Sequence, residues 1–149
     1  YLCLYLPERR RFSNSRLDSI TRVTLLEPCT FYEEVLRDLE KNKEKCWGVS
    51  FGGGANRMEE VCIKLYIDEE KEPYILNRLY REGRGGEVLK IRENQFLYTG
   101  TFFDTNEMLS WVKTFTGRIM DIQGTNLFSI AKITRDWEKM YEMYCGNEE

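Results

Sequence analysis

The sequence predicts an α+β fold organised around residues 87–123. This stretch alternates β-rich runs with one amphipathic helical segment, in the order strand, turn, strand, helix, strand. A further strand and helix precede it between residues 60 and 83. A helix that connects strands has to cover one face of a sheet, so these segments predict a two-layer domain.

The composition limits the classes of protein to consider. The chain has 149 residues, of which 42% are hydrophobic, and a net charge of −3 from 22 basic and 25 acidic side chains. This length can bury a full core and corresponds to one domain, or to one domain and a fragment. The charge balance creates no overall field that favours nucleic acid or an anionic membrane. We find no signal peptide or membrane-spanning run and expect a cytoplasmic protein with no membrane partner.

The residue types argue against an enzyme. The chain contains no histidine, which removes the commonest general base and most zinc sites. The five cysteines are scattered without a C-x-x-C pair, so we interpret them as reduced, mostly packed thiols. Residues 52–54 are glycines but no G-K-[ST] follows, which predicts a flexible connection and not a phosphate loop. We therefore expect no catalytic residue, no metal and no cofactor.

The first 27 residues predict two strands. Residues 1–6 form an unbroken apolar and aromatic run, and residues 7–11 form a charged turn. Residues 16–27 alternate between apolar and polar side chains, which predicts a second strand with a bend or bulge. A two-stranded hairpin is not stable alone in water, so it needs a partner. That partner is an N-terminal portion of the protein, another chain or the domain that follows.

A connector is expected between residues 28 and 58. Thr30 and Glu33 have the spacing of a capping box, and the short apolar stripe after them predicts an amphipathic helix of about three turns. Residues 46–57 are rich in glycine and include Trp47 and Phe51. They predict a linker whose aromatic side chains dock on a neighbouring surface.

The remainder predicts the main domain. Residues 60–67 alternate as a strand, Pro73 suits the first turn of a helix, and Gly83 ends that helix. In the central stretch, Asp104 suits the N-cap of the second helix and Gly117 the residue after its end. The resulting β-α-β-β-α-β order is that of a ferredoxin-like domain, with an antiparallel sheet and both helices on one face.

A last helix is expected after Gly124, with Thr125 or Asn126 as its cap. Its apolar residues recur at spacings of three and four: Leu127, Ile130, Thr134, Trp137, Tyr141 and Tyr144. This stripe predicts packing on the main domain or on the N-terminal segment. The alternative is a seam between two copies of the chain.

Several short motifs resemble those of WYL-domain bacterial transcriptional regulators, in which an Sm-like β-barrel is followed by a C-terminal extension. Tyr1 and Leu2 match the "YL" of the family's name motif, and residues 13–20 (SNSRLDSI) resemble its closing "xRLDRI" strand. Residues 111–117 (WVKTFTG) resemble the "W-x-x-x-F-G-G" helix end of the extension. Ser19 departs from the pattern because it stands where the family has its second arginine.

This resemblance implies a division of the chain. Residues 1–27 are expected to be the C-terminal part of the WYL barrel, and residues 28–58 the connector helix and glycine-rich linker. Residues 59–149 are expected to be the ferredoxin-like extension with its final helix. The fold expected overall is thus a ferredoxin-like domain preceded by strands of an incomplete Sm-like barrel.

The resemblance also implies a sensor in which the barrel binds an effector, in some members a nucleic acid. Tyr1 and Arg16 match motif positions, and Arg9 and Arg10 belong to a basic run beside them, so these four are the candidate ligand-binding residues. An arginine fork suits a phosphate or a carboxylate. The alternatives are an ion pair of Arg16 with Asp18 or another acid, and a solvated hairpin tip for the basic run.

The same resemblance implies the partners. We expect a homodimer, an effector that is a nucleic acid or nucleotide bound by the barrel, and DNA contacts only through a helix-turn-helix module upstream of Tyr1. Whether the regulator activates or represses is left open.

Two other classes remain as alternatives. The ferredoxin-like domain could bind RNA or another ligand on an open sheet face that presents Phe96, Tyr98 and Phe102. A small acylphosphatase-like enzyme would need an arginine in a glycine loop with an asparagine nearby. Asn56 and Arg57 precede the first strand instead of following it, which disfavours this class.

Overall fold

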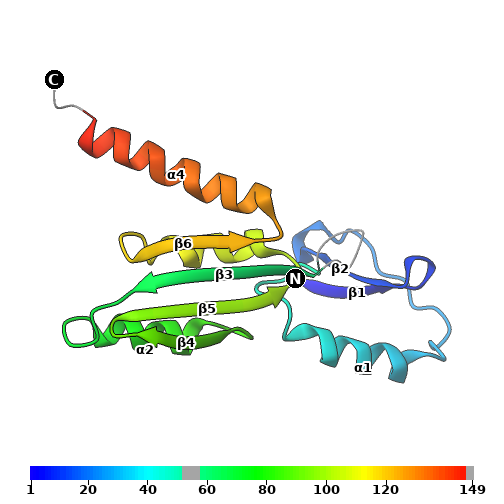
Figure 1. Cartoon of the computed structure of the whole chain (residues 1–149). Coiled ribbons are helices and arrows are strands. Elements are labelled where there is room, and N and C mark those ends of the chain that lie inside the picture. Colours follow the sequence, from blue (N-terminus) through cyan, green and yellow to red (C-terminus); the bar gives the residue numbers. More distant parts are fainter. Residues whose placement is uncertain (52–57, 147–149) are drawn as a thin grey trace.

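A computed structural model shows a four-stranded antiparallel sheet with helices packed against it and a two-stranded hairpin beyond one end (Figure 1). The structure describes residues 1–51 and 58–146. The predicted glycine connection at 52–54, and Asn56 and Arg57, lie outside the described residues. The predicted α+β class is confirmed.

The N-terminal hairpin pairs β1 (Leu2–Leu6) with β2 (Arg11–Ser15). The charged turn between them is confirmed as a 3-10 turn, Pro7–Arg9, which ends at Arg10 in a left-handed conformation with φ 48°. The second strand predicted at residues 16–27 is wrong. Leu17–Ser19 forms a 3-10 turn instead, and residues 20–27 pair with no strand in the described part of the chain. Alternation alone does not make a strand, and among the described residues no strand pairs with residues 20–27 to supply a ladder of hydrogen bonds.

The connector helix is confirmed as α1 (Tyr32–Lys43). Its predicted capping box is wrong, because Phe31 is the N-cap and makes no side-chain capping bond. A small core cluster joins α1 and the hairpin to the end of the sheet. Its buried members are Phe12, Phe51 and Phe103, with Tyr5, Val35, Leu39 and Cys46 packed against them. The hairpin therefore finds its partner in the connector helix and the following domain.

The sheet of the main domain has the order β4-β5-β3-β6, with antiparallel neighbours throughout. Its strands are β3 (Glu59–Tyr66), β4 (Glu87–Arg92), β5 (Gln95–Phe102) and β6 (Ile119–Gly124). Helix α2 (Pro73–Glu82) connects β3 to β4. A 3-10 turn, Thr105–Met108, and helix α3 (Leu109–Lys113) connect β5 to β6. These elements follow one another in the predicted order.

The main core lies between the sheet and its helices. Val61, Ile63 and Leu65 of β3 face it, as do Phe96, Tyr98 and Phe102 of β5, which are at most 1% exposed. The sequence interpretation that placed these three aromatic residues on an open sheet face is therefore wrong. Alternation does put them on one face, but that face is the one that the helices cover.

The last helix is α4 (Leu127–Cys145), capped by Asn126, whose side chain accepts a hydrogen bond from the Ser129 amide at 3.1 Å. Its first turns pack on the main domain, where Ile133 is buried and the Trp137 indole Nε1 donates to the Thr116 hydroxyl at 3.1 Å. The second half of α4 diverges from the sheet and lies apart from it (Figure 1). Throughout the part of the chain that the structure describes, every helix is too short or too polar to span a bilayer.

Candidate functional site

The hairpin register brings Tyr1 and Arg16 together. Leu2 of β1 lies opposite Ser15 of β2, so Tyr1 and Arg16 are the next facing positions at the open end of the hairpin. The pKa of Arg16 is raised, first by its hydrogen bonds to Asp18 and then by the nearby Tyr1. Tyr1 is 69% exposed, so the face of its ring is accessible from solvent.

The Arg16 guanidinium is already engaged by Asp18. Its Nε donates to Asp18 Oδ1 at 3.0 Å and its Nη2 donates to Asp18 Oδ2, so both prongs of the fork contact one carboxylate. The same contact lowers the pKa of Asp18. Since both side chains are more than 60% exposed, solvent screens the pair and an anion can reach it. An anionic ligand would have to displace Asp18 or share the fork with it.

Arg9 and Arg10 lie at the other end of the hairpin. Strand β1 has five residues and a rise of about 3.3 Å per residue, so the two ends are roughly 15 Å apart. The four predicted site residues therefore separate into two places, with Tyr1 and Arg16 at one and Arg9 and Arg10 at the other. Arg10 lines a hollow of about 480 Å³ against α1, whereas Arg9 is exposed and does not line it.

That hollow is one half of a longer groove between the hairpin and α1, which we call the hairpin–helix groove. Its charged half carries Arg10 on the hairpin side and Glu34 and Asp38 on the α1 side. Its apolar half has a volume of about 450 Å³. Four residues line both halves: Tyr5, Pro7, Phe31 and Val35. The apolar half is lined in addition by Cys3, Phe12, Cys29, Tyr32, Leu36 and Leu39. Sequence reasoning missed this groove. The signal for it was the apolar stripe of α1, whose members Val35, Leu36 and Leu39 line the apolar half.

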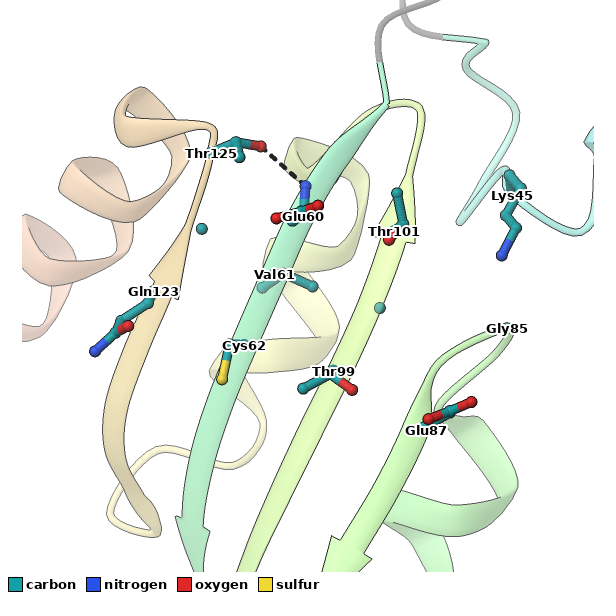
Figure 2. A pocket seen from close by; sticks show the side chains of 12 residues that line it. Lys45, Glu60, Val61, Cys62, Gly85, Glu87, Thr99, Thr101, Gln123 and Thr125 are labelled. Atoms are coloured by element: carbon teal, nitrogen blue, oxygen red, sulfur yellow. Dashed lines mark hydrogen bonds between the residues drawn. The ribbon is translucent and has the colours of Figure 1, made fainter.

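A third hollow, of about 490 Å³, lies on the sheet face away from the helices. Figure 2 shows Cys62, Thr99 and Gln123 on three neighbouring strands, with Lys45 and Glu87 near the rim. The pKa of the Cys62 thiol is raised by burial and then by Asp121, so the thiol is not activated as a nucleophile. The lining offers hydroxyl, amide, carboxylate and ammonium groups. Its charged side chains carry both signs, so the hollow has no single charge that would select a ligand. Alternation in β3 could have located this face, because Cys62 lies between Val61 and Ile63.

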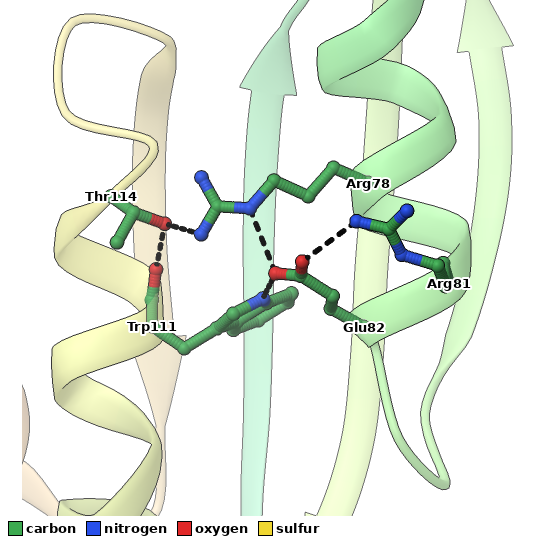
Figure 3. A network of polar contacts seen from close by, with 5 residues as sticks. All are labelled: Arg78, Arg81, Glu82, Trp111 and Thr114. Carbon is green, nitrogen blue, oxygen red and sulfur yellow. Dashed lines mark hydrogen bonds and ion pairs between the residues drawn. The ribbon is translucent and has the colours of Figure 1, made fainter.

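A polar network on the opposite side joins α2 to α3 (Figure 3). Glu82 accepts hydrogen bonds from Arg78 Nε at 2.8 Å and from the Trp111 indole Nε1 at 3.2 Å. Arg78 also donates to the Thr114 hydroxyl at 2.7 Å, so one arginine connects the two helices. The hydrogen bond from Arg78 is the main cause of the lowered pKa of Glu82. Each charge in this network has a partner, and the network is a brace between helices.

The described residues include no group of three or more histidine, cysteine, aspartate or glutamate side chains placed to hold a metal ion. Comparison with family models, with curated proteins and with solved structures finds no match to this chain. The similarity to WYL regulators therefore rests on the motif residues named above and stays a prediction.

Proposed function

We propose that the chain is the effector-sensing and dimerising portion of a WYL-type transcriptional regulator whose helix-turn-helix module lies upstream. In this proposal residues 1–27 belong to an Sm-like barrel and residues 59–149 form a ferredoxin-like extension. The observation that carries the proposal is the hairpin register, which sets Tyr1 beside Arg16. These are the two residues that match the ligand motif of the family.

The chemistry of this pair suits a phosphate-bearing effector such as a nucleotide or a short single strand of nucleic acid. The guanidinium fork can bind a phosphate through two parallel hydrogen bonds, and the exposed tyrosine ring offers a face on which a base can stack. Asp18 accepts hydrogen bonds from two nitrogens of the fork, so the effector would have to replace it. Because the contact is ionic and exposed, effector binding should weaken as the salt concentration rises.

Two observations test the regulator itself. The coding sequence upstream of Tyr1 should continue in frame into a helix-turn-helix module, whereas a stop codon directly before a native start would overturn the proposal. In an electrophoretic mobility assay, the full-length native protein should bind its own promoter DNA, and a single-stranded oligonucleotide of about 8 nucleotides should change that affinity. Arg16→Ala should abolish the change while promoter binding without the oligonucleotide stays as in the native protein. An equal response in Arg16→Ala would contradict the proposed sensor.

A further inference from the structure

The second half of α4 carries an apolar stripe that nothing in the described chain covers. With 3.6 residues per turn, the face that buries Ile133 and Trp137 continues as Met140, Tyr141 and Tyr144. These three side chains are exposed, Tyr144 to 80%. The unpartnered stripe is thus a direct continuation of an interface that the first half of the helix already uses. Helices with one apolar face are stabilised by burying the whole of it.

The hairpin–helix groove is the matching apolar surface at the other end of the molecule. Helix α1 forms its floor and has no fully buried residue. Phe31 and Tyr32 remain 40% and 58% exposed, and Val35, Leu36 and Leu39 are only partly covered. The groove therefore has the apolar lining that an amphipathic helix needs for docking.

The charges beside the two surfaces are complementary. One wall of the groove is basic at Arg10, and the other is acidic at Glu34 and Asp38. None of these three side chains forms an ion pair with another described residue. On α4, helical geometry places Glu138 at the edge of the apolar stripe next to Tyr141, and Lys139 on the polar face of the helix. A helix laid in the groove with Glu138 toward the basic wall places this carboxylate near Arg10, and this attraction favours one direction of the helix.

The two surfaces cannot meet within one molecule. Helix α4 has 19 residues and is roughly 28 Å long, and its free end points away from the hairpin and α1 (Figure 1). We propose that two copies of the chain exchange their last helices, so that the end of α4 from each copy lies in the hairpin–helix groove of the other. The exchange is reciprocal, so each dimer contains the contact twice and closes on itself instead of growing into a filament. Two linked contacts bind more tightly than either alone.

This inference gives a surface to the dimerising role proposed above. It uses none of the residues of the Tyr1–Arg16 site, so the two can fail separately. If the chain dimerises as described but the oligonucleotide response is the same in Arg16→Ala as in the native protein, the effector site is refuted and the dimer is not. If the oligonucleotide response depends on Arg16 but the chain stays monomeric, the dimer is refuted and the effector site is not.

The first test is the molar mass of the full chain, measured by light scattering during size-exclusion chromatography over a range of concentrations. The native chain should dimerise, and Tyr144→Glu on the helix and Tyr32→Glu in the groove should each raise the dissociation constant by about tenfold or more. Both positions are largely exposed, and glutamate at position 32 suits the first turn of α1, so both variants should fold. The matched control is Phe128→Glu, a similar change at a position of α4 that is 73% exposed and off the stripe. The control should dimerise like the native chain.

The second test mixes the two disabled variants. Tyr144→Glu keeps its groove intact and Tyr32→Glu keeps its helix intact, so a mixed dimer regains one of the two contacts. The mixture should therefore associate more strongly than either variant alone. A monomeric native chain, an open-ended series of larger species, or a dimer unaffected by Tyr32→Glu would overturn the proposal. The last result is the one expected if two α4 helices paired with each other.

Discussion

Gly86 and Tyr98 approach each other so closely that a Cβ atom added at Gly86 would lie 2.5 Å from the Tyr98 hydroxyl oxygen. Tyr98 is fully buried in β5, beneath the turn that leads from α2 into β4. Its hydroxyl group has no hydrogen-bond partner among the described residues. The close packing of this turn therefore leaves a polar group unsatisfied inside the main core.

Removing that hydroxyl group should stabilise the fold. An unpaired buried hydroxyl carries a desolvation penalty, so Tyr98→Phe should raise the free energy of unfolding by about 1 kcal/mol. Urea denaturation followed by circular dichroism measures the change. Tyr80→Phe is the matched control, because Tyr80 is 54% exposed and its hydroxyl is free to reach water. A loss of stability in Tyr98→Phe would mean that the hydroxyl is bonded, for instance to an ordered water molecule.

The aromatic cluster at the end of the sheet should hold the hairpin in place. Phe103 is 5% exposed and packs on Phe51, with 5.8 Å between ring centroids, and Phe51 in turn packs on Phe12 of β2. In Phe103→Ala this contact is lost, and amide hydrogen exchange should become faster in β1, β2 and α1 while the sheet remains protected. Leu89→Ala, at an exposed position of β4, should leave the pattern unchanged. Uniform acceleration across the whole chain would show that the hairpin and the sheet unfold together.

Acid should weaken the link between α2 and β6. Glu72, the N-cap residue of α2, accepts hydrogen bonds from Arg118 Nε at 2.9 Å and from its Nη2, and these contacts lower the pKa of Glu72. A carboxylate with a lowered folded pKa contributes stability above its unfolded pKa of about 4.3, and the contribution is lost as pH falls through the folded pKa. The gap in Tm between the native chain and Arg118→Gln should thus be widest near neutral pH and close at lower pH.

The matched control for this comparison is Arg92→Gln. Arg92 forms no ion pair within the described residues, so the difference in Tm between the native chain and Arg92→Gln should be small at every pH. Thermal melts at a series of pH values measure both variants. A constant gap for Arg118→Gln from neutral to acid pH would refute the assigned role of the Glu72 carboxylate.

Cys46 should be the least reactive of the thiols near the hairpin. Burial, followed by the charge of Glu107 and by Cys3, raises its pKa to about 11. Since the thiolate is the reactive form, alkylation by iodoacetamide at mildly alkaline pH should be at least roughly tenfold slower at Cys46 than at the exposed Cys29 and Cys145. Peptide mass spectrometry gives each rate separately. Labelling of Cys46 as fast as Cys29 would show that the connector opens readily.

The main domain was predictable because its signals are local. Val61, Ile63 and Leu65 alternate, Pro73 and Gly83 mark the ends of α2, and the structure confirms these elements. What the pattern could not tell was which face of the sheet the helices cover. That depends on the handedness of the crossover connections and not on any one strand, and the burial of Tyr98 shows the outcome.

The N-terminal region was less predictable because its structure depends on partners. Val23 and Leu25 alternate with polar residues as a strand would, yet they are 77% and 93% exposed and pair with no strand in the part of the chain that the structure describes. The sequence predicted only part of the arrangement of the candidate residues. Motif positions pointed to Tyr1 and Arg16, but sequence spacing could not show that Arg10 lines the same hollow as Glu34 and Asp38 of α1, since this placement depends on how the hairpin docks.

The most direct test of the proposed effector site is a fluorescence titration of a short single-stranded DNA oligonucleotide with the full-length native protein at low salt. Arg16→Ala should weaken binding by about tenfold, because the phosphate loses its bidentate partner. Asp18→Asn should strengthen it by freeing the fork, and Arg22→Ala, which removes an exposed arginine outside the hairpin, should leave it unchanged. Equal affinity of the native protein and Arg16→Ala would contradict the account.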